Sequence, residues 1–377
     1  MARRVEAGRG STGSALLLDS APFDSSNDSG PVLTKPPSRL GGTAVGDFGG
    51  NYHCTFRSGL RNSSEHRPGY SLLPHLYQDA PKIAFLIASG QIQSEVYCRF
   101  RKSNFTLMNP RLQYEIRGWA YWAKCLNPLR NTIAIGDLPL GLRMRAYKRD
   151  AVGRGLYRRK VHEPTLTKFL LTRFANSAGT NFIDVGANIG YFSCLLAKLA
   201  GPDGKVLAVE PEPQNLKLLE QNIKINNLSN VVVHSCALGA REGSAMLGLY
   251  KASNRGRHSI LDKDAKARIH VPVRTLDDVA RHSGKNVSWW SLVKIDVEGY
   301  EGFVLDGARE ILPRIETLVM EFSPASLKKA GGDPTTTLEI LTNRFSRLYR
   351  IESAGLVEIA ANDCLKNDSQ MELVFER

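Results

Sequence analysis

The sequence has few cysteines and no long apolar run. Its 377 residues include only six cysteines, and these are widely scattered. No Cys-x-x-Cys pair occurs and no histidine lies at zinc-finger spacing from a cysteine, so neither a disulfide framework nor a structural zinc site is expected. No apolar stretch approaches the roughly 18 residues that cross a bilayer, and the N-terminus lacks the apolar core of a signal peptide. These absences favour a soluble, cytoplasmic protein.

Most of the chain has nearly equal numbers of basic and acidic residues, and the excess of positive charge lies in one segment. The formal net charge is +13, and residues 81–180 alone carry 18 basic and 5 acidic side chains. Within them, residues 143–160 hold a basic cluster: Arg143, Arg145, Lys148, Arg149, Arg154, Arg158, Arg159 and Lys160. Such a cluster favours an acidic partner, which could be RNA, an anionic small-molecule acceptor or a membrane surface.

Composition divides the chain into three parts. Residues 1–80 contain 11 Gly, 11 Ser and 6 Pro, which is typical of a flexible extension without a packed core. Residues 81–139 form a basic, mixed segment of unknown role, in which Tyr114–Leu126 has the spacing of a helix. Residues 140–377 have the regular pattern of a folded domain.

Strands and helices alternate along this last part. Alternating basic and apolar residues around Gly153 and Gly155 predict a strand–turn–strand over residues 140–160, followed by an amphipathic helix over His162–Ala175. Seven strands are then expected at Asn181–Val185, Lys205–Val209, Asn230–His234, Leu292–Ile295, Thr317–Glu321, Leu348–Glu352 and Glu372–Glu376. Helices are expected at Tyr191–Ala200, at Pro213–Asn226 and near Phe303–Leu312, and an irregular stretch separates the third and fourth strands. This order predicts an α/β fold with a mostly parallel sheet.

The segment FIDVGANIG (182–190) runs from an apolar strand into a loop with two glycines. It lacks the G-x-G-x-x-G of dinucleotide-binding folds, which makes an oxidoreductase or a non-catalytic Rossmann domain the weakest interpretation. Asp184 stands two residues before Gly186, where a carboxylate suits the amino group and sulfonium of S-adenosylmethionine better than a pyrophosphate. Glu210 ends the next strand, where an acid can accept hydrogen bonds from ribose hydroxyls. Alternatively, Glu210 only caps the helix that follows.

Four ordered blocks carry a family resemblance: FIDVGANIGYFS, AVEPEPQNLKLLEQNIKINNL, VVVHSCALG and LVKIDVEGYEGFVLDGA. Together they resemble the FkbM family of S-adenosylmethionine-dependent methyltransferases. The resemblance covers roughly residues 140–377 and leaves residues 1–139 unexplained. It implies a class I methyltransferase (Rossmann-like) fold, a seven-stranded sheet with helices on both faces, and similarity to enzymes that methylate hydroxyls of sugars and polyketide-type small molecules.

The resemblance also implies roles for individual residues. The cofactor loop would be formed by Asp184, Gly186, Asn188 and Gly190. Glu210 would contact the ribose, and the adenine would lie near Cys236–Leu238, with Ala237 at its centre. Asp296, at the end of the fourth strand, would face the methyl donor and the acceptor.

The string VKIDVEGYE concentrates the candidate catalytic residues. A hydroxyl acceptor profits from a general base, which contributes about 10²–10⁴-fold. Alternation along a strand places Lys294 and Asp296 on one face, so Lys294 could lower the pKa of Asp296 or orient the acceptor. Asp296 is therefore the predicted base or acceptor contact. Glu298 is either a site residue or a helix-start residue, and the helix-start interpretation is favoured for Glu301.

Other residues leave alternatives open. His258 lies in the irregular stretch and could be the base, although a single loop histidine is more often solvated. Glu321 either lines the acceptor pocket or caps a helix at residues 326–330. No metal site is expected, because no Asp-Asn pair follows Asp296. The predicted reaction is O-methylation of a sugar or small-molecule hydroxyl. The alternative is RNA methylation, with residues 143–160 holding the nucleic acid.

Overall fold

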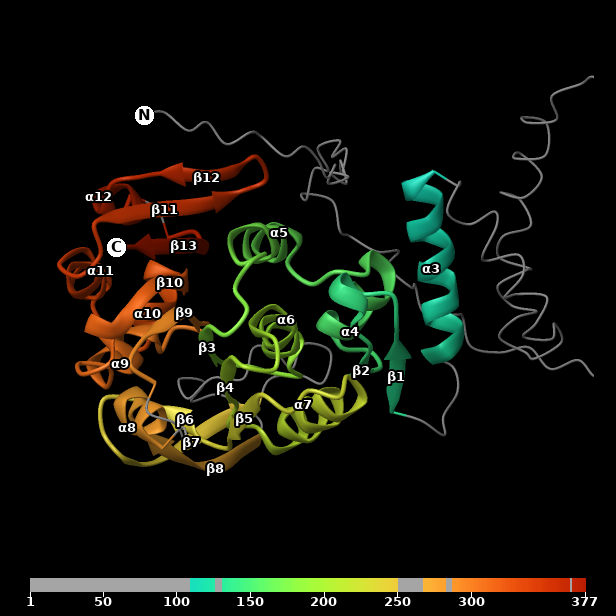
Figure 1. Ribbon diagram of the computed structural model, residues 1–377, viewed down its shortest axis with the longest axis horizontal. Helices are drawn as coiled ribbons and strands as arrows, with labels where there is room; N and C mark the ends of the chain where they lie inside the picture. Colours follow the sequence, from blue (N-terminus) through green and yellow to red (C-terminus); the bar gives the residue numbers. More distant parts are fainter. Residues whose placement is uncertain (1–108, 126–130, 250–266, 283–286, 367) are drawn as a thin grey trace, which may run out of the picture. The chain divides into compact units, whose positions relative to one another are not determined.

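Figure 1 shows the chain as a computed structural model, which describes residues 109–125, 131–249, 267–282, 287–366 and 368–377. The chain divides into two units, Met1–Gly69 and Tyr70–Arg377, and every described residue belongs to the second. The predicted flexible extension (1–80) and His258 lie outside the described residues. Among the helices of the described ranges, none has the length and apolar content that a membrane span requires.

A mixed sheet of eight strands forms the centre of the fold, in the order β12-β11-β13-β10-β9-β3-β4-β5. Neighbours from β10 to β5 run parallel, and β13 lies antiparallel between β10 and β11. The strands are β3 (Asn181–Val185), β4 (Lys205–Val209), β5 (Val231–His234), β9 (Trp290–Ile295), β10 (Ile315–Phe322), β11 (Arg347–Glu352), β12 (Gly355–Glu358) and β13 (Met371–Glu376). All seven predicted strands are present, with ends shifted by at most two residues.

The eighth strand differs from the predicted count of seven. β12 pairs only with β11, as the second arm of a hairpin at the edge of the sheet. All four of its residues are exposed, so it lacks the alternation of apolar and polar side chains that reveals a half-buried strand.

Helices cover both faces of the sheet, as predicted. Successive strand residues point to opposite faces, so Phe182 packs in one apolar cluster and Ile183 in the other. The cluster containing Phe182 includes residues of α5 (Pro164–Arg173), α6 (Tyr191–Ala200) and α7 (Pro213–Ile225). The cluster containing Ile183 includes residues of α8 (Leu276–Arg281), α9 (Glu301–Asp306), α10 (Pro324–Lys329), α11 (Pro334–Thr342) and α12 (Ala361–Cys364). The predicted helix near Phe303–Leu312 starts earlier, as α9, and is followed by the turn η3 (Leu312–Arg314).

The predicted strand–turn–strand over residues 140–160 is only half correct. After the turn η1 (Pro139–Gly141), β2 (Met144–Tyr147) pairs antiparallel with β1 (Thr132–Ile135), but the chain then forms the helix α4 (Ala151–Arg159). Asp150 caps this helix by accepting hydrogen bonds from the N–H groups of Val152 and Gly153. A Cβ at Gly153 would lie 2.5 Å from the carbonyl oxygen of Tyr147, so this glycine permits close packing of a helix and does not mark a turn.

Two further segments complete the described part. The helix expected over Tyr114–Leu126 is α3 (Pro110–Cys125), which contacts α4 through Tyr121 and Tyr157 at a ring distance of 5.7 Å. The stretch expected to be irregular contains a three-stranded sheet of β6 (Ala237–Leu238), β8 (Ala267–Arg274) and β7 (Gly243–Leu249). That prediction was wrong, because β7 and β8 expose many of their side chains and so show no apolar run.

Candidate active site

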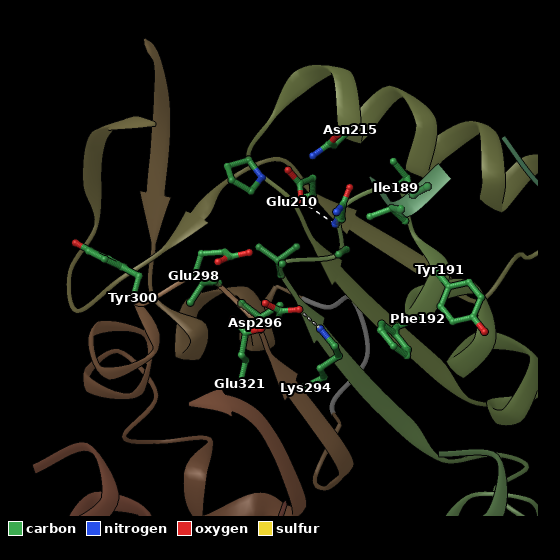
Figure 2. A pocket seen from close by; sticks show the side chains of 18 of the residues that line it. Ile189, Tyr191, Phe192, Glu210, Asn215, Lys294, Asp296, Glu298, Tyr300 and Glu321 are labelled. Carbon is green, nitrogen blue, oxygen red and sulfur yellow. Dashed lines mark hydrogen bonds and ion pairs between the residues drawn. The ribbon is translucent and has the colours of Figure 1, made fainter. Parts of the chain in front are cut away.

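A cavity of about 340 Å³ lies at the carboxyl ends of β3, β4 and β9 (Figure 2). The strand order reverses between β3 and β9, and such a switch point is where open α/β sheets bind ligands. Of the nine site residues predicted from the sequence, seven line the cavity: Gly186, Asn188, Glu210, Ala237, Lys294, Asp296 and Glu298. The other two, Asp184 and Gly190, are not part of its lining. The roles assigned to all nine stay predictions.

The loop after β3 is held in place by hydrogen bonds that its backbone N–H groups donate to residues at the end of β4. Gly186 and Ala187 both donate N–H hydrogen bonds to the carbonyl oxygen of Val209, and Asn188 donates its N–H to the Glu210 carboxylate. The N–H groups that would cradle a pyrophosphate in a dinucleotide fold are therefore already engaged. Gly186 and Gly190 have φ of +80° and +85°, a region that glycine enters without steric cost.

Asp184 lies behind the cavity. It is 1% exposed, and Ser193 donates its hydroxyl hydrogen bond to Oδ2 of Asp184 at 2.5 Å. Asp184 is paired in register with Lys294 of β9. Burial raises the pKa of Asp184, although the charge of Lys294 and the hydrogen bond from Ser193 act in the opposite direction. Asp184 therefore does not line the cavity itself but lies next to Lys294, which does.

Glu210 is buried at the end of β4 and faces the cavity. Its Oε2 accepts the N–H of Asn188 at 2.8 Å, and its Oε1 accepts the N–H of Glu212 at 2.9 Å. Burial raises its pKa to about 7, against the effect of these hydrogen bonds. The capping role considered for Glu210 belongs to Glu212, which accepts the N–H of Asn215 at 2.7 Å at the start of α7.

This end of the cavity fits S-adenosylmethionine. Glu210 offers carboxylate oxygens to hydroxyl donors, and Asn215 brings a buried side-chain oxygen without a hydrogen-bond partner among the described residues. The segment Cys236–Leu238 adds an apolar wall on which an adenine can lie. Sequence reasoning missed Asn215, whose only local signal is its position in the first turn after the Glu-Pro-Glu-Pro string.

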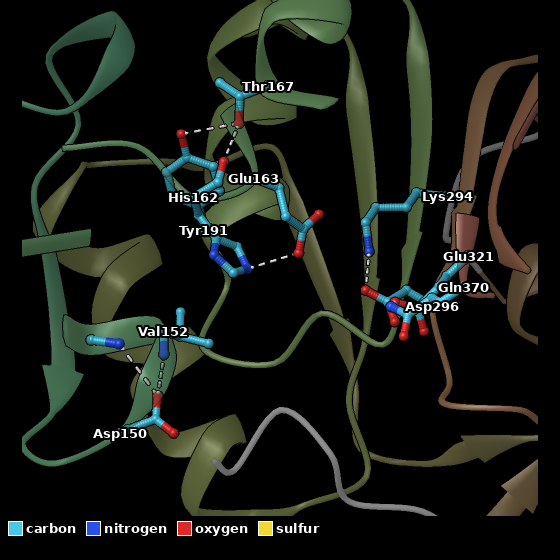
Figure 3. A network of polar contacts seen from close by, with 11 residues as sticks. Asp150, Val152, His162, Glu163, Thr167, Tyr191, Lys294, Asp296, Glu321 and Gln370 are labelled. Carbon is cyan, nitrogen blue, oxygen red and sulfur yellow. Dashed lines mark hydrogen bonds and ion pairs between the residues drawn. The ribbon is translucent and has the colours of Figure 1, made fainter. Parts of the chain in front are cut away.

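At the other end, Lys294 and Asp296 form an ion pair (Figure 3). Nζ of Lys294 donates to Oδ2 of Asp296 at 2.9 Å, as the alternation along the strand predicts. Lys294 is 3% exposed and lies 5.0 Å from the ring centre of Phe192. Burial acts to lower the pKa of Lys294, but the charges of Asp296, Asp184 and Glu163 raise it well above its usual value. Lys294 therefore stays charged and holds Asp296 in place.

Glu298 and Glu321 lie beside Asp296. Each of the three carboxyl groups has an oxygen within 4.8 Å of the others, so in the described part of the chain this is the group whose geometry could hold a metal ion. Burial, followed by the charges of Asp296 and Glu298, raises the pKa of Glu321 to about 10. Gln370 donates its side-chain N–H to Glu321. Glu321 thus lines the cavity as a protonated carboxyl group.

Glu301 takes the helix-start position favoured by the sequence. It is the first residue of α9, is buried, and accepts the N–H groups of Val297 and Gly299 at 3.2 and 3.1 Å. It is not part of the cavity lining. The helix-cap alternative for Glu321 does not apply, since Ser323 caps α10.

Sequence reasoning also missed three residues near the Lys294–Asp296 pair. His162 and Glu163 line the cavity and contact each other, with Nε2 of His162 3.1 Å from Oε1 of Glu163. Burial acts to raise the pKa of Glu163, but the hydrogen bond and charge of His162 and the charge of Lys294 lower it to about 2. Glu372 is paired in register with Glu321, and burial, then the charge of Glu163, raises its pKa to about 8. The only sequence signal was the His-Glu-Pro string, which marked a helix start.

Of the basic cluster in residues 143–160, only Arg159 lines the cavity. Arg143 donates to the carbonyl oxygen of Ile225, and Lys160 donates to that of Gly136. The guanidinium of Arg158 lies over the ring of Tyr114, 3.8 Å from its centre. These side chains hold neighbouring elements of the fold together.

Known proteins match the part of the chain that contains the cavity. A family model described as the methyltransferase FkbM domain matches residues 184–351. "Methyltransferase 1" of Beauveria bassiana is 31% identical over 181 residues, which is 43% of this chain and 70% of that protein. "Methyltransferase sdnD" of Sordaria araneosa is 33% identical over 165 residues, which is 36% of this chain and 63% of that protein. The chain thus spans about two thirds of the length of these relatives.

Among solved structures, a methyltransferase FkbM from Methylobacillus flagellatus aligns with 81% of this chain and 60% of its own. The TM-score is 0.37 and the sequence identity 15%.

Proposed function

The chain belongs to the FkbM family of S-adenosylmethionine-dependent methyltransferases, and on this premise we propose that it methylates a hydroxyl of a neutral, polyhydroxylated acceptor such as a sugar or a natural product. S-adenosylmethionine is its cofactor and supplies a methyl group activated by a sulfonium. We propose that Glu210 faces the ribose and that the wall around Ala237 faces the adenine.

The observation that carries the proposal is the Lys294–Asp296 pair in the cavity wall. The Asp296 side chain is 26% exposed, and Lys294 fixes one of its oxygens at 2.9 Å. Asp296 can therefore orient an acceptor hydroxyl and take its proton as the oxygen is methylated. Holding the acceptor oxygen in line with the methyl group lowers the barrier as well, and such positioning can supply on the order of 7–11 kcal/mol in favourable intramolecular reactions.

The carboxyl groups around this pair favour a neutral acceptor. Glu321, which lines the cavity, holds a proton near neutral pH because burial raises its pKa to about 10. A protonated carboxyl group both donates and accepts hydrogen bonds, as sugar hydroxyls do. The ionised Glu163 and the neighbouring Glu298 would repel a phosphate or carboxylate on the acceptor. An anionic acceptor is thus disfavoured at this end.

The alternative of RNA methylation has less support. It rests on the basic residues of 143–160, but Arg143, Arg158 and Lys160 contact other elements of the protein. A test is methyl transfer from labelled S-adenosylmethionine to neutral glycosides, sugar phosphates and RNA, at 50 and 200 mM salt. We expect alkali-stable methyl ethers on a neutral acceptor, with little effect of salt. Label in RNA alone, with activity falling roughly 10³-fold or more between the two salt concentrations, would overturn the proposal.

We also propose that the reaction takes place in the cytoplasm. The four described cysteines, Cys125, Cys194, Cys236 and Cys364, are all buried and unpaired, which is typical of a reducing compartment. Fractionation of cells that express the full chain tests this proposal, and recovery in a secreted fraction would contradict it.

A further inference from the structure

The side-chain oxygen of Asn215, at the end of the cavity that holds Glu210, is a buried hydrogen-bond acceptor that the fold leaves without a donor among the described residues. Asn215 lies in the first turn of α7, is 2% exposed and lines the cavity above Glu210 (Figure 2). Its backbone N–H is bound by Glu212, so its side chain has no part in capping the helix. Its Oδ1 is buried without a hydrogen-bond partner among the described residues. An unpaired buried acceptor of this kind costs about 1–3 kcal/mol.

The amide orientation of Asn215 follows from Glu210. The Asn215 side chain lies close enough to the Glu210 carboxyl group to lower its pKa, which is the effect of a donor facing a carboxylate. The NH₂ group of Asn215 is therefore the end that faces Glu210. The carbonyl oxygen of Asn215 is then left as the free acceptor.

Glu210 already holds two backbone N–H groups. A carboxylate offers about four lone pairs, and one on each oxygen of Glu210 receives the N–H of Asn188 or of Glu212. The vicinal diol of a ribose brings two O–H donors. Oδ1 of Asn215 is a second buried acceptor at the same end of the cavity, and it has no hydrogen-bond partner among the described residues.

We propose that Glu210 and Asn215 divide the ribose diol of the cofactor, one hydroxyl donating to Glu210 and the other to Oδ1 of Asn215. Asn215 is thereby a cofactor-binding residue that selects for a complete ribose. The proposal goes beyond the choice of acceptor and does not depend on it. It concerns binding alone, so its test needs no acceptor substrate.

The experiment is calorimetric titration with S-adenosylhomocysteine and with its 2′-deoxy and 3′-deoxy analogues. Asn215→Ala should bind S-adenosylhomocysteine about five- to tenfold more weakly, as expected for one lost hydrogen bond. For one of the two deoxy analogues, the wild type and Asn215→Ala should bind equally, because the hydroxyl that meets Asn215 is absent. The other analogue keeps the hydroxyl that meets Asn215, so Asn215→Ala should again bind it about five- to tenfold more weakly than the wild type does.

Two controls separate this role from a structural one. Glu220→Ala changes an exposed residue of the same helix and should bind all three ligands as the wild type does. Thermal unfolding without ligand shows whether Asn215→Ala is folded. Equal weakening of all three ligands by Asn215→Ala would mean that the residue only supports Glu210, and unchanged binding of S-adenosylhomocysteine would mean that Oδ1 has no ligand. Either result overturns the proposal.

Discussion

Gly186 in the loop after β3 lies directly against the backbone carbonyl of Asp296 in the loop after β9. A Cβ at position 186 would be 1.8 Å from that oxygen, far inside any tolerable contact. The loop predicted to hold the cofactor and the residue proposed to receive the acceptor proton are therefore in contact, and the close approach depends on the absence of a side chain.

Gly186→Ala should consequently destabilise the protein and weaken cofactor binding. The substitution adds both the overlap with Asp296 and the strain of a φ of +80°. We expect a loss of roughly 3 kcal/mol or more in the free energy of unfolding, measured by urea denaturation.

Gly179→Ala is the matched control for that variant. Gly179 has nearly the same positive φ, +81°, but no atom lies within 4 Å of the position that a Cβ would occupy there. Only the backbone strain remains at this glycine, which costs about 1–3 kcal/mol. Equal losses in the two variants would contradict the claim that Gly186 is required by contact with Asp296.

Glu321 should make the folded state less stable as the pH rises. Its folded pKa is raised to about 10 from 4.5 in the unfolded chain, chiefly by burial, so the folded state binds the extra proton. The stability contributed by this group is fully present below pH 4.5 and is lost as the pH rises toward 10.

Glu321→Gln removes this titration. Relative to the wild type, the variant should be similar at pH 4.5 and more stable by roughly 5 kcal/mol at pH 8, as measured by urea unfolding at both pH values. If the difference between the two proteins does not change with pH, Glu321 is ionised in the folded state and the description of the acceptor wall as neutral is wrong.

The carboxyl groups of Asp296, Glu298 and Glu321 should act without a metal ion. Lys294 already neutralises Asp296, and Glu321 retains a proton, which leaves little charge to attract a divalent cation. Methyl transfer should therefore be unchanged after treatment with EDTA and after addition of Mg²⁺. Loss of activity on chelation, restored by Mg²⁺, would assign these carboxyl groups to a metal site.

Much of the cofactor side of the site could be predicted from sequence. Two strands and one helix begin and end where the sequence predicts, because each is a buried apolar run between loop residues: β3 (Asn181–Val185), α6 (Tyr191–Ala200) and β4 (Lys205–Val209). The ends of these strands then place Gly186 and Glu210 at one edge of the sheet.

The acceptor side could be predicted only in part. Lys294 and Asp296 are neighbours on one strand, so their contact follows from local alternation. Glu163 and Glu372 reach the same region from other elements, and their perturbed pKa values arise from burial and from charges distant in sequence. Similarly, Gly153 and Gly155 in the sequence predict a turn, whereas Gly153 lies in α4 against the backbone of β2, a tertiary contact that no local pattern reveals.

The most direct test of the account is to compare Asp296→Asn with the wild type for both cofactor binding and turnover. We propose that the cofactor lies at Glu210 and its neighbours and that Asp296 receives the acceptor proton, and both residues line the cavity. The variant should bind S-adenosylhomocysteine with nearly unchanged affinity, while methyl transfer at saturating S-adenosylmethionine falls by about 10²–10⁴-fold. Turnover equal to that of the wild type would contradict the assignment of Asp296 and, with it, the proposed mechanism.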